Sequence, residues 1–303
     1  MTPISRSPRL AIARMLSPGV LAVAFLAVSS RGLAQPLPLE PRHDAGQSIT
    51  GVFEGWFPNP DGSFSLLFGY FNRNLKEEVD IPIGPNNRIE PGGPDRGQPT
   101  HFMNGRMWGD FTIKVPSDFG TAKLTWTIVA NGKTTVIPAS LKADWMLSPF
   151  IDAISNTPPV LSFQGFDQNG PTVQGPRGLA ESKTAKPSQP LALTVWVADD
   201  NVISPGRQPP KVPATVTWTL FRGPDSVKFS ETKPAMEKID GKMPPKATFA
   251  AKATTNATFS TPGEYTLQVT ANDASGDGGG GFQCCWTVAH VKVSVASAPT
   301  GGH

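Results

Sequence analysis

The chain has few of the residues by which catalytic and metal sites are recognised in a sequence. Its 303 residues include only 2 Cys and 4 His. The histidines are isolated from one another, so none stands in a His-Glu-x-x-His or other paired-ligand spacing, and a zinc site has no local support. A Gly-x-Ser-x-Gly elbow and a phosphate-binding glycine loop are also absent. We therefore expect a protein that is not an enzyme, although a carboxylate pair that assembles only in the fold leaves no local signature.

Long apolar runs are missing beyond the N-terminal region. There, three arginines precede nine apolar residues (20–28), and small residues at positions 32 and 34 fit cleavage after Ala34. Such a run is too short to span a bilayer, which needs about 20 residues. We expect residues 1–34 to be a signal peptide, and the mature chain to be secreted or periplasmic without a transmembrane segment.

A surplus of basic residues is absent from the expected mature chain. The precursor has a formal net charge of +3, but its first 34 residues hold four Arg and no acid, which leaves 23 basic and 24 acidic residues. Binding to a phosphate backbone needs a basic face, and no dense cluster of Lys and Arg occurs. Nucleic acid is therefore not expected as a partner, whereas a protein or an envelope glycan is.

Proline and glycine, in contrast, are abundant: 32 Pro and 30 Gly are scattered without a period. Short segments of alternating apolar residues lie between them, which is typical of all-β architecture. A mature chain of this length predicts two domains. We expect two tandem immunoglobulin-like β-sandwiches, at residues 46–149 and 158–296, followed by a flexible tail at 297–303. Residues 145–157 are expected to be a linker or short helical connector, ended by Pro158 and Pro159.

The first of these halves shows clear alternation of apolar residues. Asp61-Gly62 and Asn131-Gly132 are dipeptides that close tight hairpins, and each lies between two such segments. The expected strands are 50–57, 63–71, 78–83, 107–115, 122–130 and 134–139.

Within this half, residues 68–115 also carry a resemblance. The motifs are Gly69-Tyr-Phe-Asn-Arg-Asn, Val79-Asp-Ile-Pro-Ile-Gly-Pro-Asn-Asn-Arg88, Pro91-Gly-Gly-Pro-Asp-Arg-Gly-Gln-Pro99 and Phe102-Met-Asn-Gly-Arg106. The segment resembles an adhesin-like module of bacterial secreted and cell-surface proteins. The resemblance implies an extracellular β-sandwich without established catalysis.

The second half contains a strand with a tyrosine near its start. After the Pro262-Gly263 turn, Tyr265, Leu267 and Val269 point to one face. A tyrosine here, with its hydroxyl bonded back to the turn, is the tyrosine corner of immunoglobulin-like sandwiches. Pro262-Gly-Glu-Tyr-Thr-Leu also resembles bacterial PKD-like modules.

Four strands of this half are expected at 191–198, 213–220, 264–272 and 286–295, which we assign to B, C, F and G by analogy. Trp218 would then be the core tryptophan of strand C. The last strand changes phase, because Trp286 and Val288 share one face while the valines at 291, 293 and 295 share the other. A β-bulge near Ala289-His290 would reconcile the two.

Acidic and amide residues follow two of these strands. The B–C and F–G loops emerge at the same end of such a sandwich, and clustered oxygen ligands suit Ca²⁺. Residues 273–278, which follow the later strand, even have the spacing of positions 1, 3, 5 and 6 of an EF-hand loop. The acid expected at position twelve of such a loop is replaced by Cys284. The alternative is that these side chains form turns by bonding their own backbone. The candidates are Asp199, Asp200, Asn201, Asp273, Ser275 and Asp277.

The two cysteines, Cys284 and Cys285, are adjacent and follow four glycines. Thiols of an exported chain meet an oxidising compartment. The options are a vicinal disulfide, a disulfide to another chain, or two free thiols, and of these we favour the vicinal ring.

Aromatic residues raise the question of glycan stacking. Trp126, Trp218, Phe111 and Phe68 are in phase with their strands and are expected in the core, which leaves Trp56 and Trp108 as candidates for stacking on sugars.

We expect a secreted, non-enzymatic binding or scaffolding protein of the envelope or extracellular space, which uses loops at the ends of its sandwiches. The alternatives are a carbohydrate-binding accessory protein with exposed Trp, and an extracellular hydrolase.

Overall fold

Strands form nearly all of the regular structure of the chain. The structure, a computed structural model, describes residues 43–167, 169–203, 205–206, 208, 210–273, 275 and 284–297. Across these residues it contains β-strands and one 3₁₀ helix, η1 (Ala143–Trp145). The all-β prediction is thus confirmed. No helix in the described part of the chain is long and apolar enough to cross a membrane. The expected signal peptide, Asp277 and nearly all of the C-terminal tail lie outside the described residues.

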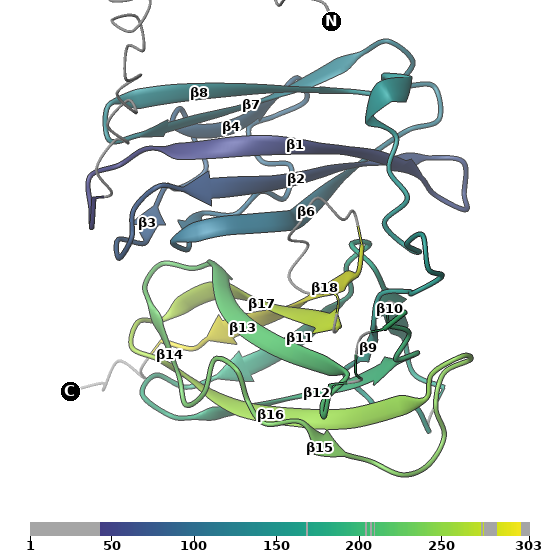
Figure 1. Cartoon of the computed structure of the whole chain (residues 1–303). Coiled ribbons are helices and arrows are strands. Elements are labelled where there is room, and N and C mark those ends of the chain that lie inside the picture. Colours follow the sequence, from purple (N-terminus) through teal and green to yellow (C-terminus); the bar gives the residue numbers. More distant parts are fainter. Residues whose placement is uncertain are drawn as a thin grey trace, which may run out of the picture. The chain divides into compact units, whose positions relative to one another are not determined.

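The first half builds two three-stranded antiparallel sheets that share a core (Figure 1). One sheet has the order β1-β2-β6, from β1 (Ile49–Pro58), β2 (Phe64–Asn72) and β6 (Gly105–Val115). The other has the order β4-β7-β8, from β4 (Asn87–Glu90), β7 (Lys123–Ala130) and β8 (Lys133–Ser140). A short pair, β3 (Val79–Asp80) and β5 (His101–Phe102), stands beside them. The strand predicted at 78–83 is therefore much shorter than expected. Ile81 is buried in the core and still donates its N–H to the Thr100 carbonyl at 2.8 Å, but it is followed by Pro82, which has no N–H to continue the pairing.

Aromatic rings fill this first core. Phe68 and Phe111 stack at 5.2 Å, and Trp126 meets both edge-on. The Trp126 indole donates to Oδ1 of Asn87, a buried side chain whose amide donates to two backbone carbonyls. The Asn131-Gly132 hairpin is confirmed, since both residues have positive φ (49° and 75°) and they join β7 to β8. Asp61-Gly62 likewise lies in the turn between β1 and β2.

The second half also builds two sheets around one core. The first has the order β10-β9-β12-β16-β14, with β15 paired to β16; its strands are β9 (Val160–Ser162), β10 (Thr172–Gln174), β12 (Leu191–Asp199), β14 (Val227–Phe229), β15 (Glu237–Lys238) and β16 (Phe249–Phe259). The second has the order β11-β18-β17-β13, from β11 (Ala180–Ala185), β13 (Ala214–Arg222), β17 (Gly263–Asp273) and β18 (Trp286–Val295). Strand β11 runs parallel to β18, whereas the other pairs are antiparallel.

Trp218 and Tyr265 occupy the places that the sequence predicts for them. Both are buried in the second core, and the Tyr265 hydroxyl donates to the Thr261 carbonyl at 2.9 Å. The longest strand of the other sheet, β16, was not predicted. Its inward positions are largely alanines, such as Ala251, Ala253 and Ala257, and alanine is depleted in strands.

The bulge predicted near Ala289-His290 is wrong. Strands β17 and β18 pair without a register shift from Gly263↔Val295 to Asn272↔Trp286. One face of β18 carries Val291 and Val293 into the second core. The opposite face carries Trp286 and Val288 against Phe57, Leu67 and Leu147 of the first half. The strand therefore looks out of phase in sequence because both of its faces are buried.

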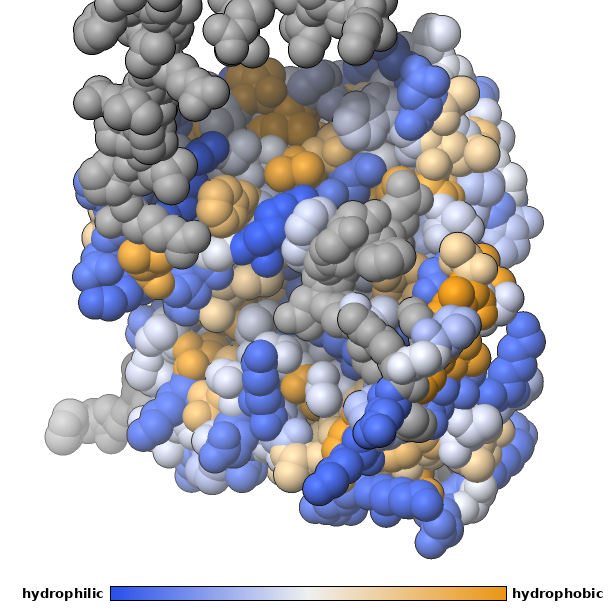
Figure 2. Space-filling view, in the orientation of Figure 1, coloured by the Kyte–Doolittle hydropathy of each residue, from blue (hydrophilic) through white to orange (hydrophobic). Residues whose placement is uncertain are grey.

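The two halves lie in one compact unit, Arg42–His303, and share several contacts. Phe221, at a register shift in β13, is buried in the aromatic core of the first half. Next to it, Arg222 pairs with both carboxylate oxygens of Asp95 at 2.8 and 3.0 Å and donates from Nε to the Gln98 carbonyl. The Asp-Arg-Gly-Gln-Pro motif of the resemblance thus docks the second half. On the outer surface drawn in Figure 2, apolar and hydrophilic residues are mixed.

The connector between the halves is held at several points. Leu147 donates its N–H to the Trp56 carbonyl at 2.7 Å, and Phe150 meets Phe57 edge-on at 5.1 Å. A helical connector was one of two expectations for residues 145–157; helix η1 ends at the first of these residues, and the remainder is irregular.

Substitution of Gly109 tests the contact between the halves. Gly109 has a φ of 49°, and an added Cβ would collide with the Trp286 ring. Gly62 also has a positive φ (80°), but open space surrounds its missing Cβ. Each Ala substitution should lose about 1–2 kcal/mol from backbone strain. We expect Gly109→Ala to lower the free energy of unfolding by roughly a further 1 kcal/mol or more, because Trp286 must move. Equal losses in urea titrations of both variants would show that Trp286 does not hold the halves together.

Candidate functional site

A buried chain of polar side chains crosses the contact between the two halves. Gln268 on β17 donates from Nε2 to Asp110 on β6 at 2.9 Å, and its Oε1 lies 2.9 Å from Nε2 of His290 on β18. Since an amide oxygen only accepts, His290 Nε2 must carry the proton. The second oxygen of Asp110, Oδ2, is buried and has no hydrogen-bond partner among the described residues.

Burial also shifts the pKa values at both ends of this chain. Burial raises the pKa of Asp110 to about 7, against the opposing hydrogen bond from Gln268. Burial lowers the pKa of His290 to about 4, helped by the charges of Arg222 and Lys292. The imidazole is therefore neutral at pH 7, while the carboxyl is near its midpoint.

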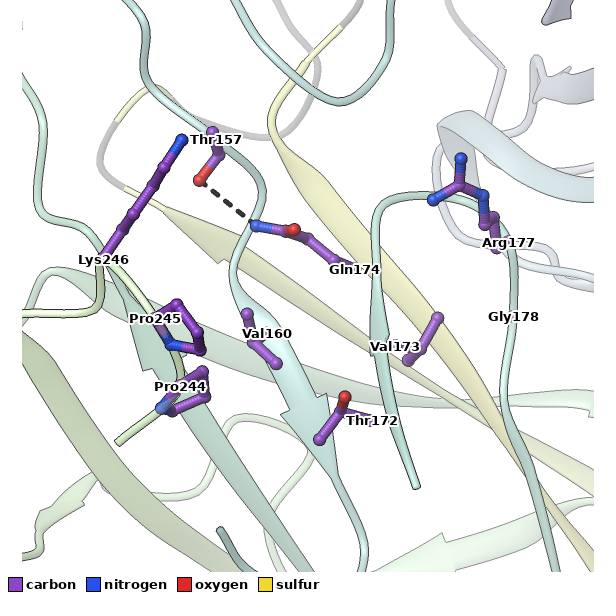
Figure 3. A pocket seen from close by; sticks show the side chains of 10 residues that line it. All are labelled: Thr157, Val160, Thr172, Val173, Gln174, Arg177, Gly178, Pro244, Pro245 and Lys246. Atoms are coloured by element: carbon purple, nitrogen blue, oxygen red, sulfur yellow. Dashed lines mark hydrogen bonds between the residues drawn. The ribbon is translucent and has the colours of Figure 1, made fainter. Parts of the chain in front are cut away.

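Asp110 and His290 line one of three neighbouring clefts. Arg177 is the one residue that lines all three of them. The junction cleft, about 330 Å³, contains Asp110, His290 and Lys292. The hairpin cleft, about 430 Å³, lies beside the β1–β2 turn and contains the Asp61–Lys114 ion pair. The outer cleft, about 590 Å³, lies over β9 and β10. Figure 3 shows its lining, with residues 244–246 facing β10 across Val160.

Arg177 is held in place where these clefts meet. Its guanidinium carbon lies 3.8 Å from the centroid of the Phe150 ring, a favourable cation–π contact. It stands on a turn whose Gly175 donates its N–H to Thr287 Oγ1 at 2.8 Å, and a Cβ at Gly175 would collide with Phe150. Within the described part of the chain, Arg177 has no ion pair and donates no hydrogen bond. A fixed guanidinium with free donors is suited to binding an anionic group.

The predicted acidic loops do come together, but most of their oxygens form turns. Asp199 Oδ1, Asp200 Oδ1 and Asp273 Oδ1 each accept the N–H two residues ahead. Asp200 Oδ2 accepts from Thr157 N and Oγ1, and Ser275 Oγ donates to Asp273. The turn chemistry weighed from the sequence is thus present.

Asp199 and Asp273 differ from Asp200 in their burial. Burial raises the pKa of Asp199 to about 7, and the charges of Asp273 and Asp200 act in the same direction. Burial also raises the pKa of Asp273. Across the described residues, no group of three or more His, Cys, Asp and Glu side chains could hold a metal ion.

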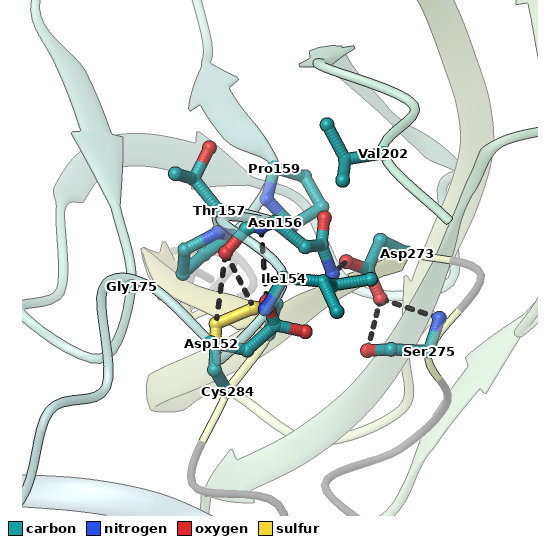
Figure 4. Close-up of a disulfide and its surroundings, with 12 residues drawn as sticks. Asp152, Ile154, Asn156, Thr157, Pro159, Gly175, Val202, Asp273, Ser275 and Cys284 are labelled. Atoms are coloured by element: carbon teal, nitrogen blue, oxygen red, sulfur yellow. Dashed lines mark hydrogen bonds between the residues drawn. A yellow bond between two sulfur atoms is a disulfide. The ribbon is translucent and has the colours of Figure 1, made fainter. Parts of the chain in front are cut away.

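Asn156 links these acids to the cysteines. Its Nδ2 donates to Asp273 Oδ2 at 2.6 Å, as Figure 4 shows. The sulfurs of Cys284 and Cys285 lie 3.9 and 3.5 Å from its carbonyl oxygen. In the structure these sulfurs are joined in a vicinal disulfide, which is buried.

The two tryptophans predicted for glycan stacking are half-buried. The Trp56 indole donates to the Lys142 carbonyl at 2.7 Å and meets Phe64 edge-on. The Arg106 guanidinium lies 4.0 Å above the Trp108 ring, so one face of that ring is covered. Trp145, at 48% exposure, is more open than either. Stacking by Trp56 or Trp108 stays a prediction.

His101 forms a separate charged cluster. Its ring nitrogens lie 2.8 Å from Asp80 and 3.1 Å from Glu78. Burial alone would lower the pKa of His101, but these two hydrogen bonds raise it to about 9. The protonated ring has no lone pair for a metal, so this cluster is an ion triad.

Sequence reasoning missed Arg177, Asp110 and Gln268. Asp110 and Gln268 stand at outward positions of their strands, where solvent would be the ordinary expectation. Only the Gly-Pro-Arg-Gly sequence at 175–178, which presents an arginine on a glycine-flanked turn, could have drawn attention to the site.

Comparison with known proteins adds little to this description. No protein-family model matches the chain. No curated protein matches it either. Among solved structures, the D00-D0 domain of intimin is 10% identical, with 82% of this chain and 100% of that one covered and a TM-score of 0.24. The fimbrial adhesive subunit CfaE of enterotoxigenic Escherichia coli is 8% identical over 86% and 81%, with a TM-score of 0.22. A family 123 glycoside hydrolase from Clostridium perfringens is 12% identical, with a TM-score of 0.23; the match covers 39% of this chain and only 23% of the hydrolase. Likenesses at this level carry no argument about function.

The raised pKa of Asp110 predicts a pH-dependent effect of Asp110→Asn. A carboxyl whose pKa is higher in the folded state binds more protons there, so its contribution to stability falls as pH rises from about 4 to about 7. Asparagine keeps the acceptor for Gln268 without the charge. We expect the variant to gain stability relative to wild type between about pH 5 and about pH 8. Asp118→Asn, at an exposed site, should leave the profile unchanged. Thermal melts at both pH values measure the stability of each variant relative to wild type. Parallel pH profiles for Asp110→Asn and wild type would contradict a raised pKa of Asp110.

The vicinal disulfide predicts a monomer with a mass two hydrogens below that of the dithiol. Intact-mass spectrometry of the unreduced chain should show this deficit, and reduction should abolish it. A disulfide-linked dimer, or full-mass monomer that alkylates without reduction, would contradict the intramolecular ring.

Proposed function

We propose that this is an exported, non-enzymatic binding or scaffolding protein, built from two immunoglobulin-like β-sandwiches, whose ligand lies in the three clefts that meet at Arg177. The immunoglobulin-like assignment is supported in the second half by the sheet order β11-β18-β17-β13 opposite β9-β12-β16-β14. The core Trp218 and the Tyr265–Thr261 hydrogen bond agree with it. Export is supported by the signal-like N-terminal sequence.

Arg177 is the observation that carries the binding proposal. Its guanidinium is fixed on Phe150 and lines all three clefts. Lys246 and Lys292 line two of the clefts, and neither forms an ion pair among the described residues. An exposed cation without an acceptor, on a rigid support, is suited to an anionic group of a ligand.

The alternatives have less support from the clefts. Hydrolysis by a carboxylate pair needs two acids that flank one bond. In the described part of the chain, Asp110 is the acid of the junction cleft, and Asp61 in the hairpin cleft is paired with Lys114. Glycan binding through Trp56 or Trp108 would use rings that lie outside these clefts and already have protein contacts.

Charge reversal at Arg177 tests the proposal. The fluorescently labelled exported chain would be applied to arrays of immobilised peptides and envelope polysaccharides. We expect wild type to be retained on a subset of them, and Arg177→Glu to bind that subset about tenfold more weakly or worse, since hydrogen bonds to a charged group are lost.

Lys233→Glu provides the matched control, because it makes the same change of charge at an exposed lysine that lines none of the three clefts. It should be retained like wild type, and melting temperatures of both variants check the fold. Equal retention of Arg177→Glu and wild type would remove the clefts as the site. Cleavage of the arrayed material would contradict a non-enzymatic role.

A further inference from the structure

Two aspartates face each other at one end of the second sandwich. On β12, Val195 and Val197 point into the core, and strand alternation places Asp199 on the same face. On β17 of the opposite sheet, Val269 and Ala271 point into the core, and Asp273 follows in the same phase. Both acids are nearly buried, with exposures of 3% and 8%.

The surroundings of these two acids provide oxygens but no cation. Asn156 approaches from the connector, where its amide donates to Asp273 (Figure 4). Three buried oxygens remain without a hydrogen-bond partner among the described residues: Asp199 Oδ2, Asn156 Oδ1 and Asn201 Oδ1. None of the four residues forms an ion pair with Lys or Arg within the described part of the chain. Unpartnered buried oxygens beside two acids are an unstable arrangement unless a ligand joins them.

We propose that Asp199, Asp273, Asn156 and Asn201 bind a calcium ion that closes this end of the second sandwich. The ligand set consists of carboxylate and amide oxygens alone, which calcium prefers, and it lacks the imidazole and thiolate ligands of zinc. It differs from the set that the sequence predicts. Asp200 and Ser275 are excluded because neither is buried and neither has an unpartnered buried oxygen, and Asn156 is added.

The position of Asn156 gives the ion a structural role. Asn156 lies in the connector between the two sandwiches, and its carbonyl contacts the disulfide that precedes β18. Calcium would therefore fix the connector to the ends of both sheets of the second sandwich.

Thermal melts of the full exported chain test the site. After treatment with EDTA, added Ca²⁺ should raise the melting temperature by about 5 °C or more at a concentration near 100 times the dissociation constant. Mg²⁺ should have a much smaller effect, because it demands stricter octahedral geometry. An unchanged transition at millimolar Ca²⁺, or equal shifts with both ions, would overturn the calcium site.

Three substitutions separate the site from general effects on the fold. Asp199→Asn should abolish the Ca²⁺-induced shift, yet melt at or above the wild-type temperature in EDTA, because it removes one of two facing charges. The neighbouring Asp200→Asn should keep the shift, whatever its own melting temperature. Asp273→Asn repeats the test from the opposite sheet. A full Ca²⁺ shift in Asp199→Asn, or its loss in Asp200→Asn, would place any ion elsewhere.

Discussion

Burial of both faces of one sheet is the constraint on which the rest of this structure depends. The sheet β11-β18-β17-β13 closes the second core with one face and packs against the first half with the other. Apolar contact alone does not account for this second face, because Gln268 and His290 lie on it as well. Their hydrogen bonds to each other and to Asp110 satisfy polar groups that would otherwise be costly to bury. The contact between the two halves is therefore held in one position by these hydrogen bonds, in addition to the burial of its apolar side chains.

The same contact creates the candidate site. The junction cleft is lined by residues of β6 and β18, and Arg177 stands on a turn that is fixed to β18 through Thr287. Phe150, the ring beneath Arg177, rests in turn on Phe57 of the first half. Neither half alone would hold this guanidinium in its present place.

Much of the fold was accessible from the sequence, because strands with one buried face alternate visibly. This holds for Phe111, Ile113 and Val115 on β6 and for Tyr265 near the start of β17. Two kinds of element were not accessible: strands too short to alternate, such as β5, and β16, whose inward residues are largely alanines. Strand β18 was predicted with its correct bounds, but its two buried faces were misread as a bulge.

The sites were harder to predict, for a related reason. Turn-forming aspartates and aspartates with unpartnered buried oxygens have the same spacing in sequence, so Asp200 could not be separated from Asp199. Asn156 lies more than a hundred residues from Asp273, its hydrogen-bond partner, in a segment that looked like a linker. Asp110 and Gln268 looked like ordinary surface residues because nothing local announces that another sandwich will cover them.

Phe221 has a consequence for the order in which the chain can acquire its structure. It is a residue of the second half that completes the core of the first, and Arg222 meets a partner 127 positions earlier. Contacts between such distant positions form late, after the entropy of closing a long loop has been overcome. Until this strand is in place, the core of the first half lacks one of its buried aromatic side chains. The core of the first half is therefore complete only when the second half is present, unlike that of a domain that can be exchanged freely between proteins.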